Sequence, residues 1–85
     1  AEALKLRGDK ALAGSKYRLA FDLYSQAIVR RADWWELWAA RALVQARLEK
    51  WEDCLGDCDE ALRRAGSTPS AKVLARRGLA LYHLD

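Results

Sequence analysis

The chain has 85 residues, of which 52% are hydrophobic and 32% charged, and its formal net charge is +3. This length limits it to one small domain with a modest core. No apolar run approaches the roughly 20 residues of a membrane span. The two cysteines lie on one expected helix and do not make a disulfide framework, so we expect an intracellular, reduced and cytoplasmic protein. We expect neither a cofactor nor a metal.

Apolar residues recur at three- and four-residue spacing in five segments, which predicts an all-α chain. The expected helices cover 2–14, 18–31, 35–47, 51–65 and 69–83. A Gly-Ser pair at 14–15 separates the first from the second. Asp33 is the expected N-cap of the third helix, with Glu36 completing a capping box. Thr68 is expected to cap the fifth helix, with Pro69 at its first position.

The most informative pattern in the chain is a period of 34 residues. Small, large and basic residues return at this distance in the pairs Gly8/Ala42, Ala20/Cys54, Ala27/Ala61, Leu4/Trp38, Tyr17/Trp51, Ile28/Leu62, Arg7/Arg41, Lys16/Lys50 and Arg30/Arg64. After a shift of two residues the pattern starts again, with Leu74, Arg77 and Gly78 in the third copy. Such a period is typical of stacked helical repeats. The single domain, 1–85, is therefore divided into repeats at 1–34 and 35–68 and a partial third repeat at 69–85.

The period and its residues resemble the tetratricopeptide repeat (TPR) family. The resemblance is carried by Ala1 to Leu4, Gly8, Tyr17, Ala20, Tyr24 and Ala27 in the first copy, and by Trp38, Trp51, Ala61 and Leu62 in the second. Ala32 and Gly66 stand where the family has its closing proline. The resemblance implies a short right-handed superhelix of about five helices, built from helix-turn-helix repeats. It also implies a protein–protein interaction module rather than an enzyme.

Two segments are similar to co-chaperone TPR domains of the carboxylate-clamp type, Lys-Leu-Arg-Gly-Asp-Lys-Ala-Leu at 5–12 and Gly-Asp-Cys-Asp-Glu-Ala-Leu at 56–62. That subclass binds the acidic C-terminal tails of heat-shock chaperones with two Lys, one Arg and two Asn. The resemblance places Lys5, Lys72 and Arg76 at the positive positions of the clamp. It implies an adaptor or co-chaperone-like module that holds a peptide or an acidic tail in a concave groove.

Both asparagines of the clamp are absent, because Asp9 stands at one position and Ala40 at the other. Asp9 repels a carboxylate and lies one helical turn from Lys5, which it can neutralise. Ala40 removes a donor, and Leu43 adds an apolar side chain on the same helix. The expected peptide site is thus a partly degraded clamp made of Lys5, Asp9, Ala40, Leu43, Lys72 and Arg76.

Two other functions are consistent with the same sequence. One is a scaffold domain that binds a folded partner, or self-associates, through Trp34, Trp35 and the uncovered face of the last helix. The other is a docking domain of a larger enzyme. Lys5, Lys72 and Arg76 also have a structural interpretation as solvated surface residues, and the two tryptophans one as packing between repeats.

Further features have structural interpretations. The repeated Arg7, Arg41 and Arg77 are expected to lie between helices or to pair with acids. Cys54 and Cys58 are expected to be small core residues, because no further ligand accompanies them to form a metal site. Nucleic acid is not expected as a partner, because the arginine pairs are interspersed with acidic residues. The chain lacks a nucleophile–base constellation.

Overall fold

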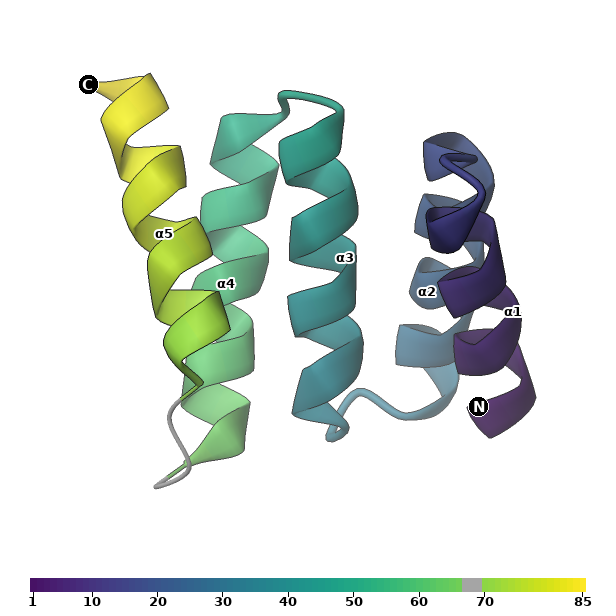
Figure 1. Ribbon diagram of the computed structural model, residues 1–85. Coiled ribbons are helices and arrows are strands. Elements are labelled where there is room, and N and C mark those ends of the chain that lie inside the picture. The colour runs from purple at the N-terminus through teal and green to yellow at the C-terminus, as the bar shows by residue number, and fades with distance from the viewer. Residues whose placement is uncertain (67–69) are drawn as a thin grey trace.

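The structure, a computed structural model, describes residues 1–66 and 70–85, and within them it contains five helices and no strand (Figure 1). The helices are α1 (Glu2–Ala13), α2 (Tyr17–Arg30), α3 (Trp35–Arg47), α4 (Trp51–Ala65) and α5 (Ala71–Leu84). The predicted all-α fold is confirmed, and each expected boundary lies within two residues of the observed one. In the described ranges, no helix has the length and apolar character needed to cross a membrane.

Consecutive helices run antiparallel and pack against one another (Figure 1). α1 lies against α2, and α3, α4 and α5 follow one another across the rest of the molecule. α5 contacts α3 as well as α4. Contacts between neighbouring helices therefore hold the fold together, as expected for a stack of helical repeats.

Two buried clusters of side chains stabilise this stack. The first joins α1, α2 and α3 and includes Tyr24 and Val44, neither of which has exposed surface. The second joins α3, α4 and α5 and includes Cys54, Cys58 and Val73. Both cysteines are free and fully buried, which confirms the prediction that they are small core residues.

The turns after α1 and α3 have the same geometry, one repeat period apart. Ser15 and Glu49 both adopt a left-handed backbone conformation, with φ of 59° and 58°. The next amide in each turn, that of Lys16 or Lys50, donates to a carbonyl five residues earlier at 2.8 Å. This is the bond pattern of a Schellman motif. The predicted break at 14–15 is confirmed, and the period extends to the backbone of the turns.

The predicted N-cap of α3 is wrong. Asp33 accepts hydrogen bonds from the guanidinium of Arg31 at 3.1 and 3.3 Å. The N-cap position is held by Trp34, which makes no side-chain capping bond, and its Nε1 donates to Glu36 at 2.9 Å. The charged donor of Arg31 engages the carboxylate of Asp33 more strongly than a neutral backbone amide does, so the capping box does not form.

The start of the fifth helix also differs from the prediction. Thr68 and Pro69 lie outside the described residues. α5 begins at Ala71, and Ser70 is its N-cap, with Oγ accepting a hydrogen bond from the amide of Val73 at 3.5 Å. A serine thus caps α5 by the mechanism that was expected of the threonine.

Candidate functional site

The α1 part of the predicted clamp is a hydrogen-bonded chain of three side chains. Nζ of Lys5 lies 3.1 Å from Oδ2 of Asp9, one helical turn away. Oδ1 of Asp9 accepts a hydrogen bond from the hydroxyl of Tyr24 on α2. Burial, and then the hydrogen bond to Asp9, raise the pKa of Tyr24 well above its ordinary value of 10. Both oxygens of Asp9 are therefore engaged, and the charge of Lys5 is partly neutralised.

The missing side chain of Gly8 allows Tyr24 to reach Asp9. A Cβ at position 8 would lie 2.7 Å from Cε1 of Tyr24, which is too close for any side chain. The tyrosine ring therefore packs directly against the backbone of α1. Sequence reasoning did not place Tyr24 at the site. The sequence does contain a signal for this contact. In the second repeat the position of Gly8 holds the larger residue Ala42, and the position of Tyr24 holds the smaller residue Cys58.

The third helix contributes apolar side chains to the predicted site. Ala40 is half-buried and packs against the first cluster. Leu43 is also half-buried. Neither side chain carries a polar atom, so at these two positions α3 offers contact area to a ligand but no hydrogen-bond donor.

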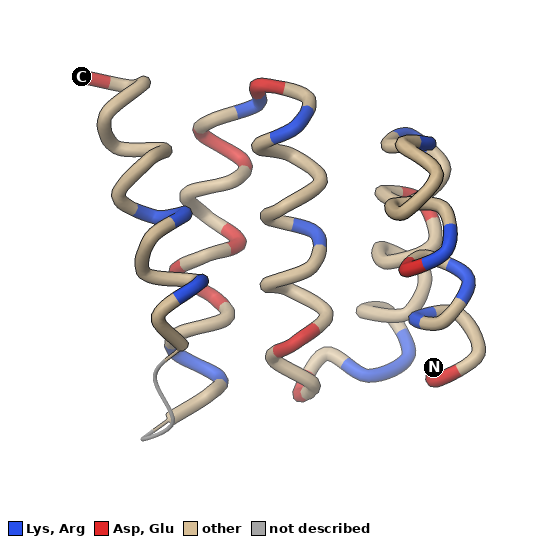
Figure 2. Tube along the Cα trace, in the orientation of Figure 1, with Lys and Arg blue, Asp and Glu red and all other residues tan. Residues whose placement is uncertain are grey.

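The predicted cations of α5 are not neutralised in the way Lys5 is. Lys72 is exposed and Arg76 is half-buried, one helical turn from it. Within residues 1–66 and 70–85, neither side chain forms an ion pair. Figure 2 shows basic residues along α5 and an acidic residue only at the C-terminal Asp85. The free positive charge of the predicted site is therefore on α5.

The six predicted residues do not form one cluster, because they lie on three different helices. Lys5 and Asp9 lie on α1, Lys72 and Arg76 lie on α5, and α3 stands between these helices (Figure 1). A surface pocket of about 380 Å³ lies elsewhere, between α1 and α2, and none of the six residues lines it.

The two tryptophans predicted as interface residues are half-buried and pack against the protein's own core. Trp34 packs against the first cluster and Trp35 against the second. The cations of Arg31 and Lys5 lie 5.5 and 6.0 Å from the centre of a Trp34 ring, which is within cation–π range. Both tryptophans thus stabilise the junction before α3, and their role at an interface stays a prediction.

The repeated arginine pairs with an acid in the second and third copies. The guanidinium of Arg41 contacts both oxygens of Asp57 on α4, at 2.7 and 3.0 Å, and Oγ of Ser25 on α2 at 3.1 Å. Arg77 on α5 pairs with Asp59 on α4 at 2.6 Å. The predicted structural role of these two arginines is confirmed.

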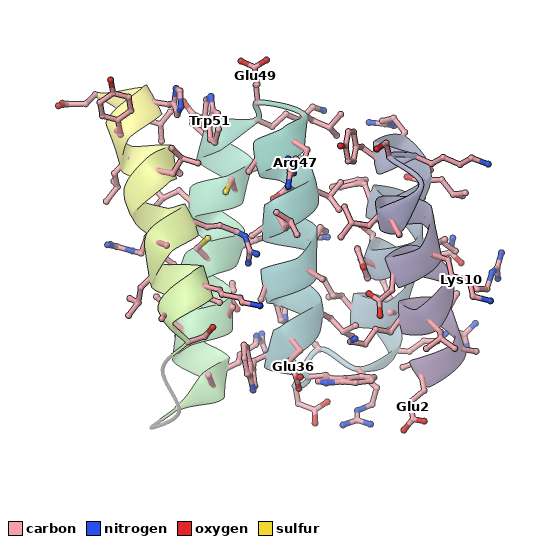
Figure 3. The ribbon with its side chains drawn as sticks, viewed as in Figure 1. Glu2, Lys10, Glu36, Arg47, Glu49 and Trp51 are labelled. Atoms are coloured by element: carbon pink, nitrogen blue, oxygen red, sulfur yellow. The ribbon has the colours of Figure 1, made fainter. Side chains whose placement is uncertain are left out.

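The remaining polar residues do not assemble a metal site. No group of three or more His, Cys, Asp and Glu side chains able to hold a metal occurs in residues 1–66 and 70–85. Contact with Cys54, together with burial, raises the pKa of the Cys58 thiol, which therefore stays protonated. His83 stacks on Trp51, with the ring centres 4.0 Å apart. Figure 3 shows Trp51 at the start of α4, next to the C-terminal end of α5.

Comparison with curated proteins gives two partial relatives, although no family model matches the chain. The chain is 36% identical over 63 residues to human Tetratricopeptide repeat protein 12, covering 74% of this chain and 9% of that protein. It is 31% identical over 90 residues to rat Mitochondrial import receptor subunit TOM70, covering 100% of this chain and 14% of that protein. The chain thus spans only a small part of the length of each relative.

Solved structures match the chain over most of its length. The first TPR of Spaghetti (RPAP3), bound to the HSP90 peptide SRMEEVD, has a TM-score of 0.91 at 29% identity and covers 98% of this chain and 64% of that one. The second TPR of Spaghetti (RPAP3), bound to the same peptide, has a TM-score of 0.91 at 32% identity and covers 96% of this chain and 74% of that one. The chain belongs to the tetratricopeptide repeat family.

A third TPR structure shares the fold at lower identity. The TPR2B domain of yeast Sti1, in complex with pHsp70, has a TM-score of 0.88 at 21% identity and covers 98% of this chain and 65% of that one. The predicted resemblance to the TPR family is confirmed. As a member of this family, the chain is a protein-interaction module. The repeat boundaries and the ligand-binding residues stay predictions.

Proposed function

We propose that this TPR chain binds an extended peptide with an acidic C-terminus, and that Lys72 and Arg76 of α5 hold its carboxylates. The proposal depends chiefly on one observation, that these two cations have no acidic partner within the described residues. The TPR structures bound to SRMEEVD support an acidic tail as the ligand. A charge-assisted hydrogen bond to such a tail contributes about 1.5–3 kcal/mol.

The α1 end of the site makes this binding weaker than that of an intact clamp. The carboxylate of Asp9 is held in place by Tyr24 and Lys5, so it cannot turn away from a ligand without losing both contacts. A ligand carboxylate near Lys5 would meet a like charge, which disfavours binding. Affinity is therefore set mainly by α5, with Ala40 and Leu43 of α3 offering apolar contact to the peptide.

The test is fluorescence polarisation of labelled SRMEEVD with either a free or an amidated C-terminus. We expect micromolar binding that requires the free carboxylate, weakens with added salt and falls about tenfold in Arg76→Ala. Arg30→Ala is the matched control, because Arg30 is an exposed arginine of α2, and its affinity should be unchanged. Equal binding of the amidated peptide, or of Arg76→Ala, would contradict the proposal.

A second candidate function is docking of a folded partner, or of a second copy, on the outer face of α5. Large apolar side chains between 41% and 77% exposed gather on this helix, namely Leu74, Leu79, Leu81, Tyr82 and Leu84. Exposed apolar patches of this kind mark interaction surfaces. Sedimentation velocity over a range of concentrations tests self-association. A dimer that Leu81→Glu dissolves and Lys5→Ala preserves would support it, whereas a monomer at every concentration would exclude a second copy.

A further inference from the structure

One face of α1 corresponds to one face of α3 and one face of α5. On α3 and on α5 the preceding helix, α2 or α4, covers this face. The corresponding positions are Ala3, Arg7 and Lys10 on α1, then Leu37, Arg41 and Val44 on α3, then Val73, Arg77 and Ala80 on α5. We call this set of positions the stacking face. Leu37 and Val44 have no exposed surface, in the cluster that joins α3 to α2. Val73 and Ala80 are 2% and 0% exposed, in the cluster that joins α5 to α4.

The arginine of each covered stacking face bonds to the same position of the preceding helix. Arg41 donates to Ser25 on α2 at 3.1 Å, and Arg77 donates to Asp59 on α4 at 2.6 Å. Ser25 and Asp59 are 34 residues apart, which is the repeat period. Arg7 is the third member of the set, and it forms no ion pair within residues 1–66 and 70–85. A helix that covers α1 in the same way would present an oxygen atom to Arg7.

The positive charges around Arg7 favour an acidic helix as the one that covers α1. Arg7, Lys10 and Lys16 line the pocket of about 380 Å³ between α1 and α2, and none of the three forms an ion pair in the described part of the chain. Among the residues that the structure describes, no acidic side chain lines this pocket. Lys10 also stands where the other two stacking faces have Val44 and Ala80. Figure 3 shows Lys10 at the outer edge of α1, on the side away from α3.

The pocket also has an apolar part. Leu19 and Leu23 of α2 line it together with Ala11 of α1. Leu19 is 46% exposed, whereas Leu23 and Ala11 are buried. An occupant can therefore remove water from Leu19 by inserting an apolar side chain beside the three cations, and the apolar contact would add to the electrostatic attraction.

We propose that the stacking face of α1 and the adjoining pocket bind an acidic amphipathic helix of a partner protein. Its carboxylate pairs with Arg7, and its apolar side chain enters the pocket beside Leu19. The repeat geometry favours a helix over other anionic ligands, because a helix covers the same face on α3 and on α5. A second folded copy does not supply it from α4, since Asp59 is already paired with Arg77.

The test uses a helical peptide with the sequence of α4, residues 51–65, because α4 is the helix that covers the stacking face of α5. Cys54 and Cys58 are replaced by alanine to prevent oxidation. A lactam bridge joins Glu52 to a lysine introduced at Gly56, two positions that are exposed in α4, and it holds the short peptide helical. Binding to the intact 85-residue chain is followed by NMR titration of backbone amides.

We expect amide shifts confined to α1 and α2, with an affinity that falls about tenfold in Arg7→Gln. Arg30→Gln removes the same charge from α2 outside the pocket and should leave the affinity unchanged. The peptide with Asp59→Asn should bind the wild-type chain as weakly as the peptide without this substitution binds the Arg7→Gln chain. The proposal is overturned if no shifts appear up to about 1 mM peptide, if they map to α3 to α5, or if Arg7→Gln binds as well as Arg30→Gln.

Discussion

The hydroxyl of Tyr24 on α2 donates a hydrogen bond to Asp9 on α1, across a helix contact that leaves no space for a side chain at Gly8. The tyrosine therefore connects the core of the first helix pair to the predicted ligand site. A buried residue fixes the position of a surface charge, and this relationship makes the stability and the binding of the chain depend on the same pair of side chains.

The raised pKa of Tyr24 predicts a loss of stability at alkaline pH. The folded chain retains a proton that the unfolded chain releases near its ordinary pKa of 10, so stability present below pH 10 is lost as the pH rises above it. We expect this group to lower the free energy of unfolding by about 1.4 kcal/mol per pH unit above pH 10. Urea unfolding at several pH values should show that Tyr24→Phe lacks this component, while Tyr82→Phe, at a 77% exposed position, retains it.

Replacing Asp9 by asparagine should strengthen binding of the acidic peptide. The substitution removes a like charge from the site and releases Lys5, and the asparagine carbonyl still accepts the hydrogen bond of Tyr24. We expect about a tenfold gain in affinity for SRMEEVD, measured by fluorescence polarisation. Asp22→Asn makes the same change of charge at an exposed position of α2 and should have little effect. Unchanged binding of Asp9→Asn would place the ligand away from α1.

Removing the carboxylate of Asp57 should destabilise the fold. The side chains of Arg41 and Asp57 are 19% and 9% exposed, so Asp57→Ala leaves a largely buried cation without its partner. We expect a loss of about 3 kcal/mol in the free energy of unfolding, measured by urea denaturation. Glu60→Ala breaks the exposed pairs with Arg63 and Arg64 and should cost much less. Similar losses in the two variants would argue against a structural role for the Arg41 pair.

The left-handed turns predict a stabilising substitution. Glu49 has φ of 58°, a conformation that glycine adopts without steric cost. We expect Glu49→Gly to raise the free energy of unfolding by about 1 kcal/mol. Arg47→Gly, two residues earlier in the last turn of α3, should lower it by a similar amount, about 1 kcal/mol. A loss of stability in Glu49→Gly would mean that the greater backbone freedom of glycine in the unfolded chain outweighs the relieved strain at this turn.

The size difference between the two repeats predicts coupling between Gly8 and Tyr24. In the second repeat the corresponding residues are Ala42 and Cys58, both fully buried. Gly8→Ala should cost about 2 kcal/mol when Tyr24 is present. It should cost much less in a Tyr24→Leu background, where the ring atoms near position 8 are absent. A double-mutant cycle by thermal or urea unfolding measures the difference, and strict additivity would contradict the proposed contact.

Most of the fold could be predicted because it follows from a period in the sequence. The helices and the break at 14–15 depend on residue types that recur at regular spacing, and the spacing of Lys5 and Asp9 on one helix face was sufficient to predict their contact. The cap at Asp33 failed because capping competes with an ion pair to Arg31. Tyr24 and Asp9 are 15 residues apart, and the stack of Trp51 on His83 joins two different helices, so local spacing predicts neither contact.

The two buried cysteines make the packing of α5 measurable. Cys54 and Cys58 have no exposed surface and lie in the cluster that includes Val73 and Ala80 of α5. A thiol reagent can therefore reach them only when this cluster opens. Under native conditions the labelling rate divided by the rate for an unfolded peptide gives the fraction of time that the cluster is open. The chain thus carries its own chemical probe sites for local unfolding, and no cysteine has to be introduced.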